Sequence, residues 1–535
     1  MKLIILIFSF LLKCIVDCET RPNAVTPRIS KFQKLLIFLR FCGIIKVLKP
    51  NNTNKRGEKI MQNKNVQISL FDTYRHVSTA QHENQPEFFH LLDEYIDWDV
   101  IIPARFYLAF YKTTGRKRGY LLVSFLKALL LQRIFKYTED SQLLITLRHS
   151  REMRIFCGFD KVPDAAKITR FKQNFGIYLQ EIFDNLVEIT EPICREMDPI
   201  LADCLVDDTT GIESYVAENN PKFMTAKLKQ AKAIAKSNPG FDPYKSVYAM
   251  LPDCASSNPA VKRQYINGQF CYAQKAGIIT NALGIARHIA LFDDDFKKAH
   301  PEMVVEKRSD NPDVDKEIGD STSLKPLLSD FFTAHPSLKY STFIGDSAFD
   351  SYDNYNILLN EFKFERALIP LNLRNSGGNS ESAFDENGVP LCPVDKTPFD
   401  YLGKCSGKNR SERFKWVCHK SIRKGSRRDC VCENPCTDSA YGRCVYTYPH
   451  KDLRLYPGIA RGSEEWDNLY KRRVFIERTI HSFKEHACVA GRKTSNSATT
   501  KADLLLAGIV QLIGVVLADI LHKHKFARRI RKLIA

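Results

Sequence analysis

Three features are scarce in this 535-residue chain: acidic side chains, paired cysteine motifs and long apolar runs. Lys and Arg number 79 against 61 Asp and Glu, which leaves a formal net charge of +18. This charge favours a polyanionic partner, because Lys and Arg release the counterions condensed on nucleic acid. With 44% hydrophobic and 26% charged residues the chain is globular rather than disordered, and its length allows about two to four domains.

Residues 1–60 supply half of the net charge, because they hold twelve Lys or Arg residues and three Asp or Glu residues. Their apolar start lacks a clear small-residue cleavage site, so a secretory signal is the minority interpretation. Arg56, Gly57 and Glu58 can be encoded as a purine-rich ribosome-binding sequence shortly before Met61. We therefore expect residues 1–60 to be an upstream extension and translation to begin at Met61.

The cysteines are spaced without CxxC pairs. Seven of the 16 lie between residues 392 and 444, and in a large intracellular chain such a cluster indicates a metal site more than a disulfide framework. Two interpretations stay open, loosely packed thiols and a structural zinc site. The candidate zinc ligands are Cys418, Cys430, Cys432 and Cys436.

One apolar run, LLLAGIVQLIGVVLADILH, is long enough to span a membrane. Asp503, Gln511 and Asp519 lie near or within it, which favours a buried helix instead. The apolar stretch 120–135 is shorter and is interrupted by charged residues. We therefore expect no membrane partner. The basic tail 522–535 is expected to be a solvated end or to add phosphate contacts.

Residues 61–195 are predicted to form a helical DNA-binding domain. Short helical stretches are separated by Gly158 and Pro163. After this turn Lys167, Arg170 and Lys172 open a further helix, as the second helix of a helix-turn-helix motif does when it contacts DNA. The alternative is a capped and solvated helix start.

Two apolar runs end abruptly in aspartates. The run LADCLV is followed by Asp207 and Asp208. The short run at residues 342–344 is followed by Asp346, which has small residues on both sides. Between them, two β-rich runs have the signature of a hairpin. Carboxylates at strand ends are well placed to bind a metal ion, although a single aspartate there is more often a cap or turn residue.

The segment YKRRVFIERTIHSFK carries Tyr470, Arg473, Glu477 and Lys484. On an α-helix these four side chains point into one arc of roughly 60°. The set suits a metal-binding acid beside groups that hold phosphates and stack on bases, while the alternative is a solvated helix face. Together with two strand-end aspartates, the glutamate completes the parts needed for two-metal phosphoryl chemistry.

These motifs resemble those of the DDE transposases of bacterial insertion sequences, in the group with a Y-x2-R-x3-E-x6-K motif. Tyr470, Arg473, Glu477 and Lys484 match its four positions, and DDTTGIESYVAENNPKF and GDSAFDS resemble the two aspartate regions. The resemblance spans about residues 61–521. It implies an α/β fold with an RNase H-like catalytic core, an N-terminal helical DNA-binding domain and a cysteine-rich insertion before the catalytic glutamate.

The resemblance implies that Asp208, Asp346 and Glu477 are catalytic acids that bind two Mg²⁺ ions. The family pattern Asp-x-Thr fits Asp208 with Thr210 and Asp207 with Thr209 equally well. Side chains alternate along a strand, so only one of the two aspartates can enter the site. Asp208 is favoured, because the residues after it look most like the strand end of the family.

The expected domain layout follows from the 131-residue gap between Asp346 and Glu477, which is longer than one strand and helix need. The cysteine-rich, basic insertion is expected either to clasp DNA with Trp416, Tyr441 and Tyr446 or to use these aromatics as a small core. The expected segments are an extension at 1–60, a helical DNA-binding domain at 61–195, the first part of the catalytic core at 196–374, the insertion at 375–461, the second part of the core at 462–521 and the tail at 522–535.

The implied activity is transposition. The enzyme binds the terminal inverted repeats of an insertion sequence, cleaves the element ends by metal-dependent hydrolysis and joins the 3′-hydroxyl ends to target DNA. Tyr470, Arg473 and Lys484 are expected to bind DNA, and a homodimer is expected in the synaptic complex of a cytoplasmic, nucleoid-associated protein. The alternatives are a non-transposing RNase H-like nuclease and a DNA-binding regulator from a decayed element.

Overall fold

The computed structural model divides the chain into two units, residues 1–85 and 86–535. The described residues all lie in the second unit, so the predicted extension and the start at Met61 lie outside them. The ranges described are 87–112, 114–238, 240–266, 269–304, 318–372, 383–408 and 410–534.

The described part before the first strand is helical, as the sequence predicts. Its longest helix carries buried Leu179, Phe183 and Leu186 at spacings of three and four residues, the pattern of a helix with one face in a core. The helices are α4 (Glu87–Tyr95), α5 (Trp98–Ile101), α6 (Ala104–Phe110), α7 (Leu122–Ile134), α8 (Asp140–His149), α9 (Arg151–Cys157), α10 (Ala165–Asn174), α11 (Gly176–Met197) and α12 (Pro199–Ala202).

A mixed sheet follows, which within the described residues has seven strands in the order β2-β3-β4-β1-β6-β7, with β5 also paired to β4. The strand β1 is antiparallel to β4 and parallel to β6, and β6 is parallel to β7. The strands are β1 (Cys204–Glu213), β2 (Cys254–Ala255), β3 (Asn258–Ile266), β4 (Gln269–Asn281), β5 (Ala286–Leu291), β6 (Thr342–Ile344) and β7 (Arg366–Leu368).

Helices and a second set of strands complete the unit. Those between the strands of the main sheet are η2 (Ala217–Asn219), α13 (Pro221–Ser237), α14 (Pro243–Ser246), α15 (Asp294–Ala299), α16 (Asp320–Ala334) and α17 (Tyr352–Asn356). The later strands are β8 (Asp400–Gly407), β9 (Arg410–Val417), β10 (Ser421–Lys424), β11 (Arg427–Cys430) and β12 (Cys444–Thr447). The last helices are α18 (Glu464–Tyr470), η8 (Lys471–Arg473), α19 (Val474–Glu485), α20 (Ser497–Ile520), η9 (His524–Phe526) and α21 (Ile530–Ile534).

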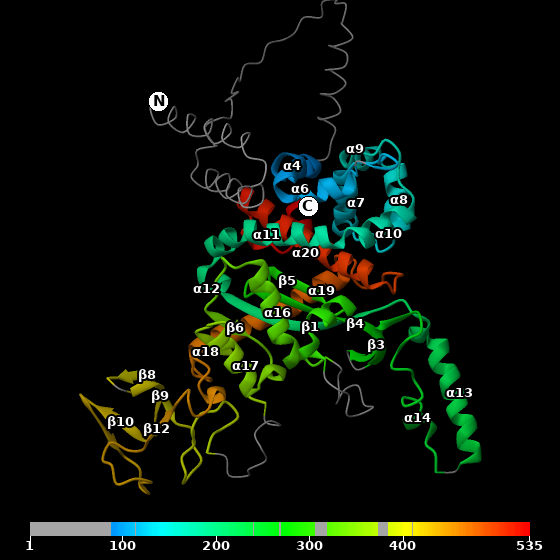
Figure 1. The fold of residues 1–535 in the computed structure, drawn as a ribbon. Coiled ribbons are helices and arrows are strands. Elements are labelled where there is room, and N and C mark those ends of the chain that lie inside the picture. Colours follow the sequence, from blue (N-terminus) through cyan, green and yellow to red (C-terminus); the bar gives the residue numbers. More distant parts are fainter. Residues whose placement is uncertain are drawn as a thin grey trace, which may run out of the picture. The chain divides into compact units, whose positions relative to one another are not determined.

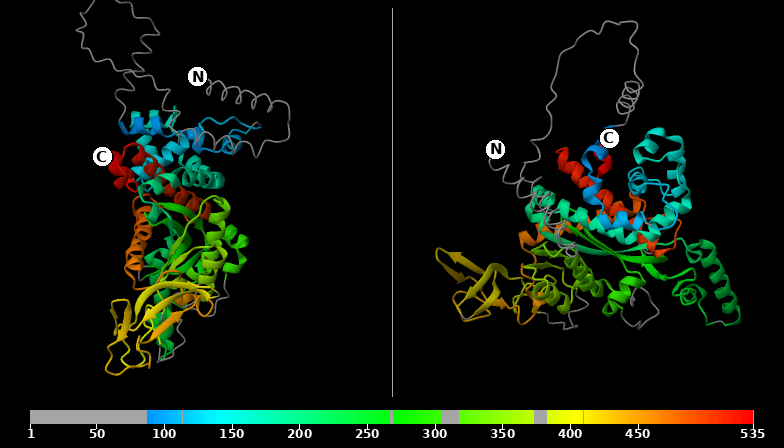
Figure 2. Two further views of the ribbon diagram at one scale, coloured as in Figure 1. Left: turned by 90° about the vertical axis from the view of Figure 1, so that its left-hand side faces the viewer. Right: turned by 45° about the horizontal axis from the view of Figure 1, so that its top comes forward.

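The two faces of the sheet belong to different cores, because successive side chains of a strand point to opposite faces. Val206 and Ile344 lie in the core that also contains residues of α11, α19 and α20. Leu205 and Phe343, one residue earlier in each strand, lie in the core of α16. Figure 1 shows α11 and α20 side by side next to the sheet, and Figure 2 gives the same arrangement from two other directions.

The apolar run near the C-terminus forms α20, which has the length and hydropathy of a membrane span. Most of its residues are nevertheless buried inside the protein, against α11 and β5. At Gly508 a Cβ atom would stand 2.6 Å from Phe183 of α11 and 2.7 Å from Ile289 of β5, so the close approach requires glycine. The burial is consistent with the core helix of a soluble protein.

The cysteine-rich segment has a small core of its own. Strands β12, β9 and β8 form a sheet of three strands in the described part of the segment, and Phe414 and Trp416 are buried against it with Tyr456. The Trp416 indole donates a hydrogen bond to Thr447 at 3.1 Å. Trp416 is therefore a core residue, and of the two roles considered for it, stacking on DNA is excluded by burial.

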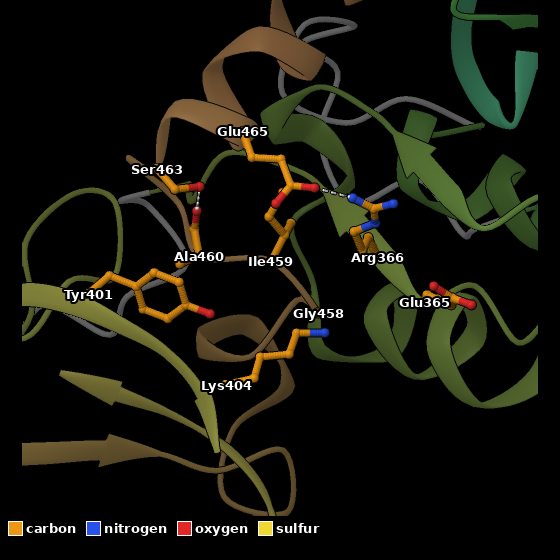
Figure 3. Close-up of a pocket in the computed structure, with 9 residues that line it drawn as sticks. All are labelled: Glu365, Arg366, Tyr401, Lys404, Gly458, Ile459, Ala460, Ser463 and Glu465. Carbon is orange, nitrogen blue, oxygen red and sulfur yellow. Dashed lines mark hydrogen bonds and ion pairs between the residues drawn. The ribbon is translucent and has the colours of Figure 1, made fainter. Parts of the chain in front are cut away.

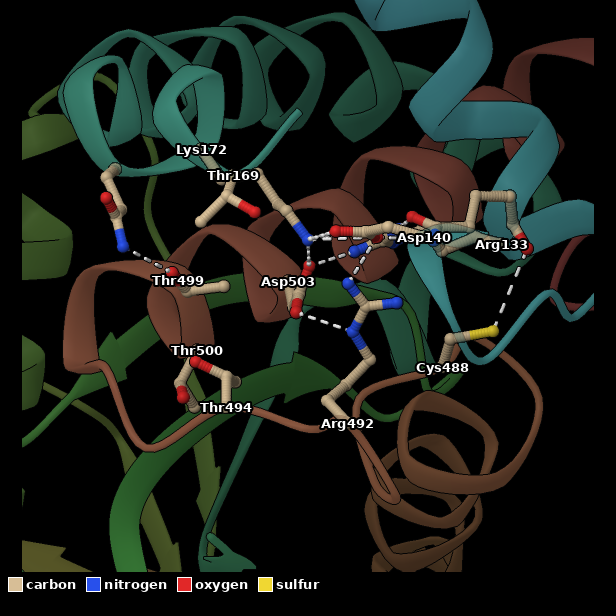
Figure 4. A network of polar contacts seen from close by, with 12 residues as sticks. Arg133, Asp140, Thr169, Lys172, Cys488, Arg492, Thr494, Thr499, Thr500 and Asp503 are labelled. Atoms are coloured by element: carbon tan, nitrogen blue, oxygen red, sulfur yellow. Dashed lines mark hydrogen bonds and ion pairs between the residues drawn. The ribbon is translucent and has the colours of Figure 1, made fainter. Parts of the chain in front are cut away.

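Buried charges join the helical part to α20 (Figure 4). Asp503, which is fully buried, contacts Arg133 of α7, Lys172 of α10 at 3.3 Å and Arg492 at 3.1 Å. Burial alone would raise the pKa of Asp503, but Lys172, Arg133 and Arg492 together hold it below its usual value. Asp140 of α8 also contacts Lys172 and Arg492, so the network ties together α7, α8, α10, α20 and the segment between α19 and α20.

Removing the central carboxylate of this network is expected to destabilise the protein strongly. Asp503→Ala leaves buried Arg133 without a carboxylate partner and leaves Lys172 and Arg492 with Asp140 alone, which costs about 3–5 kcal/mol in free energy of unfolding. The matched control is Asp519→Ala, since Asp519 lies on the same helix but its side chain is 34% exposed beside His524; we expect a loss below about 1 kcal/mol. Denaturant melts measure both, and equal losses would show that the network is not what holds these segments.

Candidate active site

Asp346 lies two residues after the end of β6, whereas Asp208 lies inside β1, which continues to Glu213; the expected strand end at Asp207 and Asp208 is therefore wrong. The parallel register pairs Val206 of β1 with Ile344 of β6, and each aspartate follows two residues later. Because side chains at i and i+2 share a face, both carboxylates project from the same side of the sheet. That side also packs against α19.

Asp207 and Asp208 are separated by the pleat of β1. Asp207 is fully buried on the α16 side, and neither of its oxygens has a hydrogen-bond partner. Burial, Asp208 and Asp320 raise the pKa of Asp207 well above its usual value. Asp208 instead has Arg473 and Asp346 as charged neighbours, so Asp208 is the aspartate on the side of the sheet that faces α19.

The segment with Tyr470, Arg473, Glu477 and Lys484 is not one continuous α-helix, and the expectation of a single regular arc is wrong in this respect. Tyr470 ends α18, residues Lys471–Arg473 form the 3-10 turn η8, and α19 begins at Val474. The backbone stays in the right-handed helical region throughout, with φ −63° at Tyr470 and φ −52° at Arg473. The tighter turn changes the rotation per residue but keeps the segment in one helical path.

Arg473 links the carboxylates of the strand and the helix. Its guanidinium donates hydrogen bonds to Glu477 at 2.7 Å and to Asp346 at 3.3 Å. Tyr470 interacts electrostatically with the same three residues. The structure thus brings Asp346 and Glu477 to one place, although 131 residues separate them along the chain.

Burial and neighbouring charges shift the pKa values of the site. Burial raises the pKa of Asp208 from its usual range to about 6; Arg473 opposes the shift and Asp346 adds to it. Burial lowers the pKa of Lys484, and its neighbours Cys271 and Asp208 oppose this shift. Lys484 is therefore in the same electrostatic environment as the first aspartate.

The donor chemistry of this site suits a hard divalent cation, because carboxylate oxygens are its preferred ligands. As the side chains stand, no three His, Cys, Asp or Glu groups among the described residues lie close enough together to hold a metal ion. Arg473 takes the position of a cation between Asp346 and Glu477. An ion that binds there has to displace this guanidinium. The carboxylates can therefore hold a divalent cation once Arg473 turns to another partner.

The basic residues of α10 that were predicted to contact DNA differ in exposure and in their partners. Arg170 is exposed, and Lys167 pairs with Asp164 at 2.6 Å at the start of the helix. Lys172 is fully buried against Asp140 and Asp503 (Figure 4). The prediction that Lys172 contacts DNA is corrected, because its ammonium group neutralises core carboxylates.

The candidate zinc ligands lie near one another in part. Cys418 is buried, and its neighbours include the thiols of Cys392, Cys436 and Cys430. Cys432 donates its thiol to the carbonyl of Asn434 at 3.3 Å. The described thiols do not form a group that could hold a metal ion in this arrangement.

A lysine stripe on α13 was missed in the sequence. Lys222, Lys229, Lys232 and Lys236 are exposed and follow one another at spacings of seven, three and four residues, so they share one helix face. No acidic residue occurs in α13 and Ala231 is its one fully buried residue. Figures 1 and 2 show the helix extending away from the sheet. The lysine spacing, with no acidic residue between the lysines, could have indicated this basic helix face in the sequence.

A separate cavity of about 240 Å³ lies between β7, β8 and the start of α18 (Figure 3). Arg366 and Glu465 line it and form an ion pair with each other at 2.5 Å. Tyr401 and Lys404 of β8 complete its polar wall. Because its principal charges already neutralise each other, this cavity does not compete with the site around Arg473.

Asp208→Asn is expected to raise the melting temperature at pH 8 but not at pH 4. The folded-state pKa of about 6 lies above the usual value, so the folded protein binds this proton more tightly than the unfolded chain. Ionisation of Asp208 therefore reduces stability as pH rises from about 4 to 6. Thermal melts should show a gain of roughly a few degrees at pH 8; an equal gain at both pH values would contradict the shifted pKa.

Residues 77–174 match the family described as a transposase domain, DUF772. The structure describes 87–112 and 114–174 of this match, which hold α4 to α10. A comparison with curated proteins finds no match. This match supports a transposase role in general terms.

Proposed function

We propose that the protein is a DDE transposase of an insertion sequence. The observation that carries the proposal is the convergence of Asp208, Asp346 and Glu477 on one side of the sheet, with Arg473 between two of them. The transposase domain at residues 77–174 supports the same assignment from a different part of the chain. The motif resemblance adds the type of chemistry.

The mixed sheet and its helices serve in this proposal as an RNase H-like core. The supporting feature is the central position of β1, with antiparallel β4 on one side and parallel β6 on the other. Asp208 in the middle of β1 and Asp346 just after β6 then lie on the same side of the sheet, and α19 brings the third acid. The cysteine-rich segment between β7 and α18 is the insertion.

The three acids are proposed to hold two magnesium ions. When bound, magnesium would neutralise charge on the scissile phosphate and on the attacking and departing oxygens. The protein would supply the carboxylate oxygens, from β1, from the residues after β6 and from α19. The raised pKa of Asp208 is consistent with this role. Burial and Asp346 destabilise the charged form of this carboxyl group, and a nearby cation would stabilise it.

Arg473 is proposed to exchange partners when DNA enters. Its guanidinium is held by two carboxylates in the described state, and it can turn to a terminal phosphate once other cations neutralise these acids. Lys484 contributes a second cation near Asp208. Tyr470 offers a ring face on which a base can stack.

The DNA partner is proposed to contact several basic surfaces. Lys167 and Arg170 on α10 are accessible, and the α13 stripe adds Lys229 and its neighbours along one helix face. Such lysines bind phosphates irrespective of sequence and set the position of the duplex. Cleavage of both ends of the element requires two active sites, so a homodimer on inverted repeats and target DNA is proposed, in the cytoplasm and associated with the nucleoid.

A structural zinc ion is proposed for the cysteine-rich segment, with Cys418, Cys430, Cys432 and Cys436 as its ligands. The proximity of Cys418 to Cys430 and Cys436 supports it. The hydrogen bond from Cys432 to Asn434 would have to break for this ligand set to close. A zinc ion would stabilise a segment whose own apolar core is small.

Glu477→Gln is expected to bind inverted-repeat DNA normally and to lose cleavage in Mg²⁺ by roughly 10³-fold or more. The change keeps the shape of the side chain but removes a ligand charge. Glu485→Gln is the matched control, because Glu485 is an exposed glutamate at the other end of the same helix. Cleavage and strand-transfer assays on labelled element ends measure both variants.

Each outcome discriminates between functions. Cleavage by Glu477→Gln at the rate of the unchanged protein would overturn the assignment. Cleavage without joining of the 3′-hydroxyl would indicate a non-transposing nuclease, and binding without cleavage by the unchanged protein would indicate a regulator. Asp208→Asn is expected to abolish cleavage, whereas Asp207→Asn, on the opposite face of β1, is expected to retain it.

Zinc binding is expected to depend on the clustered thiols and not on scattered ones. Metal analysis of the purified protein should find stoichiometric zinc, which a double variant with Cys418→Ser and Cys436→Ser loses. Cys254→Ser, at a partly exposed cysteine on β2, is expected to keep it. Purified protein without zinc, in an active and folded state, would exclude the zinc site.

A further inference from the structure

A cavity of about 530 Å³ lies where the C-terminal helices meet α19. Residues of α19, α20 and α21 line it, together with the residues between η9 and α21. Arg478 on its wall directly follows Glu477 in the chain, so one helix contributes to both the active site and this cavity. The acids discussed above do not line it.

The lining of this cavity is strongly cationic. Arg478, Arg528, Arg529 and Lys532 all contribute to it, and no aspartate or glutamate does. Within the described part of the chain, none of these four cations forms an ion pair. Arg473, only five residues before Arg478, has two carboxylate partners. Arg133 also lines the cavity and pairs with Asp503, but these four cations are not neutralised by carboxylates of the described residues.

Three of the neighbouring guanidinium groups gather around one ring. Arg528, Arg478 and Arg472 lie 4.4, 5.3 and 5.7 Å from the centre of the Phe475 ring. Burial lowers the pKa of Arg528, and Arg478 and Arg529 lower it further. Gathering like charges costs free energy that an anion bound among them would recover. The ring holds the planar groups in place, which reduces the entropy lost on binding.

Arg531 has a different role in the same region. It donates hydrogen bonds to the carbonyl oxygens of Ile134 at 2.5 Å, Arg133 at 3.1 Å and His486 at 2.7 Å. These bonds fix α21 against α7 and the end of α19. Arg531 therefore builds the wall of the cavity and leaves Arg478, Arg528 and Arg529 to face its contents.

We propose that this cavity binds the phosphodiester backbone of DNA outside the catalytic site, with Arg478, Arg528 and Arg529 as phosphate ligands. Guanidinium groups suit phosphate oxygens because they present paired N–H donors. The proposal rests on the proposed function, since a transposase must hold DNA beyond the phosphate that it cleaves. Because Arg478 and Glu477 lie on the same helix, a phosphate contact made by Arg478 would couple DNA binding to the position of Glu477.

The test is the salt dependence of binding to a random-sequence duplex, measured by fluorescence anisotropy. Each phosphate contact contributes about 0.9 to the slope of log K against log salt, so the triple variant R478Q/R528Q/R529Q should reduce the slope by about 2.7. The control K298Q/K339Q/K363Q removes the same charge at three exposed lysines that lie outside the cavity and outside the predicted DNA-binding domain. It is expected to leave the slope nearly unchanged.

Arg528 packs on Phe475, so its loss can affect folding. The double variant R478Q/R529Q changes exposed side chains only, and it should reduce the slope by about 1.8. Equal slopes for this folded double variant and the unchanged protein would overturn the proposal. If the unchanged protein does not bind DNA, the proposed function fails as well; if it binds and cleaves DNA while the slopes agree, only the cavity proposal fails.

Discussion

The parallel pairing of β1 with β6 is the constraint on which the site depends. Its register sets Val206 beside Ile344, and the pleat then decides that Asp208 and Asp346 share a face while Asp207 points to the other. A shift of one residue would place Asp207 toward α19 and leave Asp208 in the α16 core. The apolar residues before each aspartate prevent this shift, because they fill two different cores.

The helix α19 has to satisfy two demands at once. Ile476, Ile480 and Phe483 are buried against the sheet and α20, and this packing fixes the height and rotation of the helix. Glu477 and Arg473 then reach the acids of the strands from the edge of the same face. The 3-10 turn before α19 lies between the two groups, with Tyr470 stacked on Trp466 within α18 before it and Arg473 directed to Asp346 at its end.

Much of this arrangement could be read from the sequence, and the rest depended on tertiary contacts. The position of Asp346 just after β6 was predictable because an apolar run stops there, whereas pairing with β4 carries β1 past Asp208 to Glu213. The burial of Lys172 was not predictable, since its partner Asp503 lies 331 residues away and nothing in the sequence pairs the two residues. The break between α18 and α19 was also hidden, because the sequence there has no glycine or proline to mark it.

The basic residues of this protein therefore fall into groups that composition cannot separate. One group forms ion pairs with Asp140 and Asp503 inside the fold and therefore adds nothing to the attraction of a polyanion; it consists of Arg133, Lys172 and Arg492. Arg473 is held by acids that belong to the site and can be released only by other cations. The lysines of α13 and the arginines around Phe475 have no such partners among the described residues, and their positive charge acts outward. The affinity of the chain for DNA should depend on this last group, rather than on the net charge of +18.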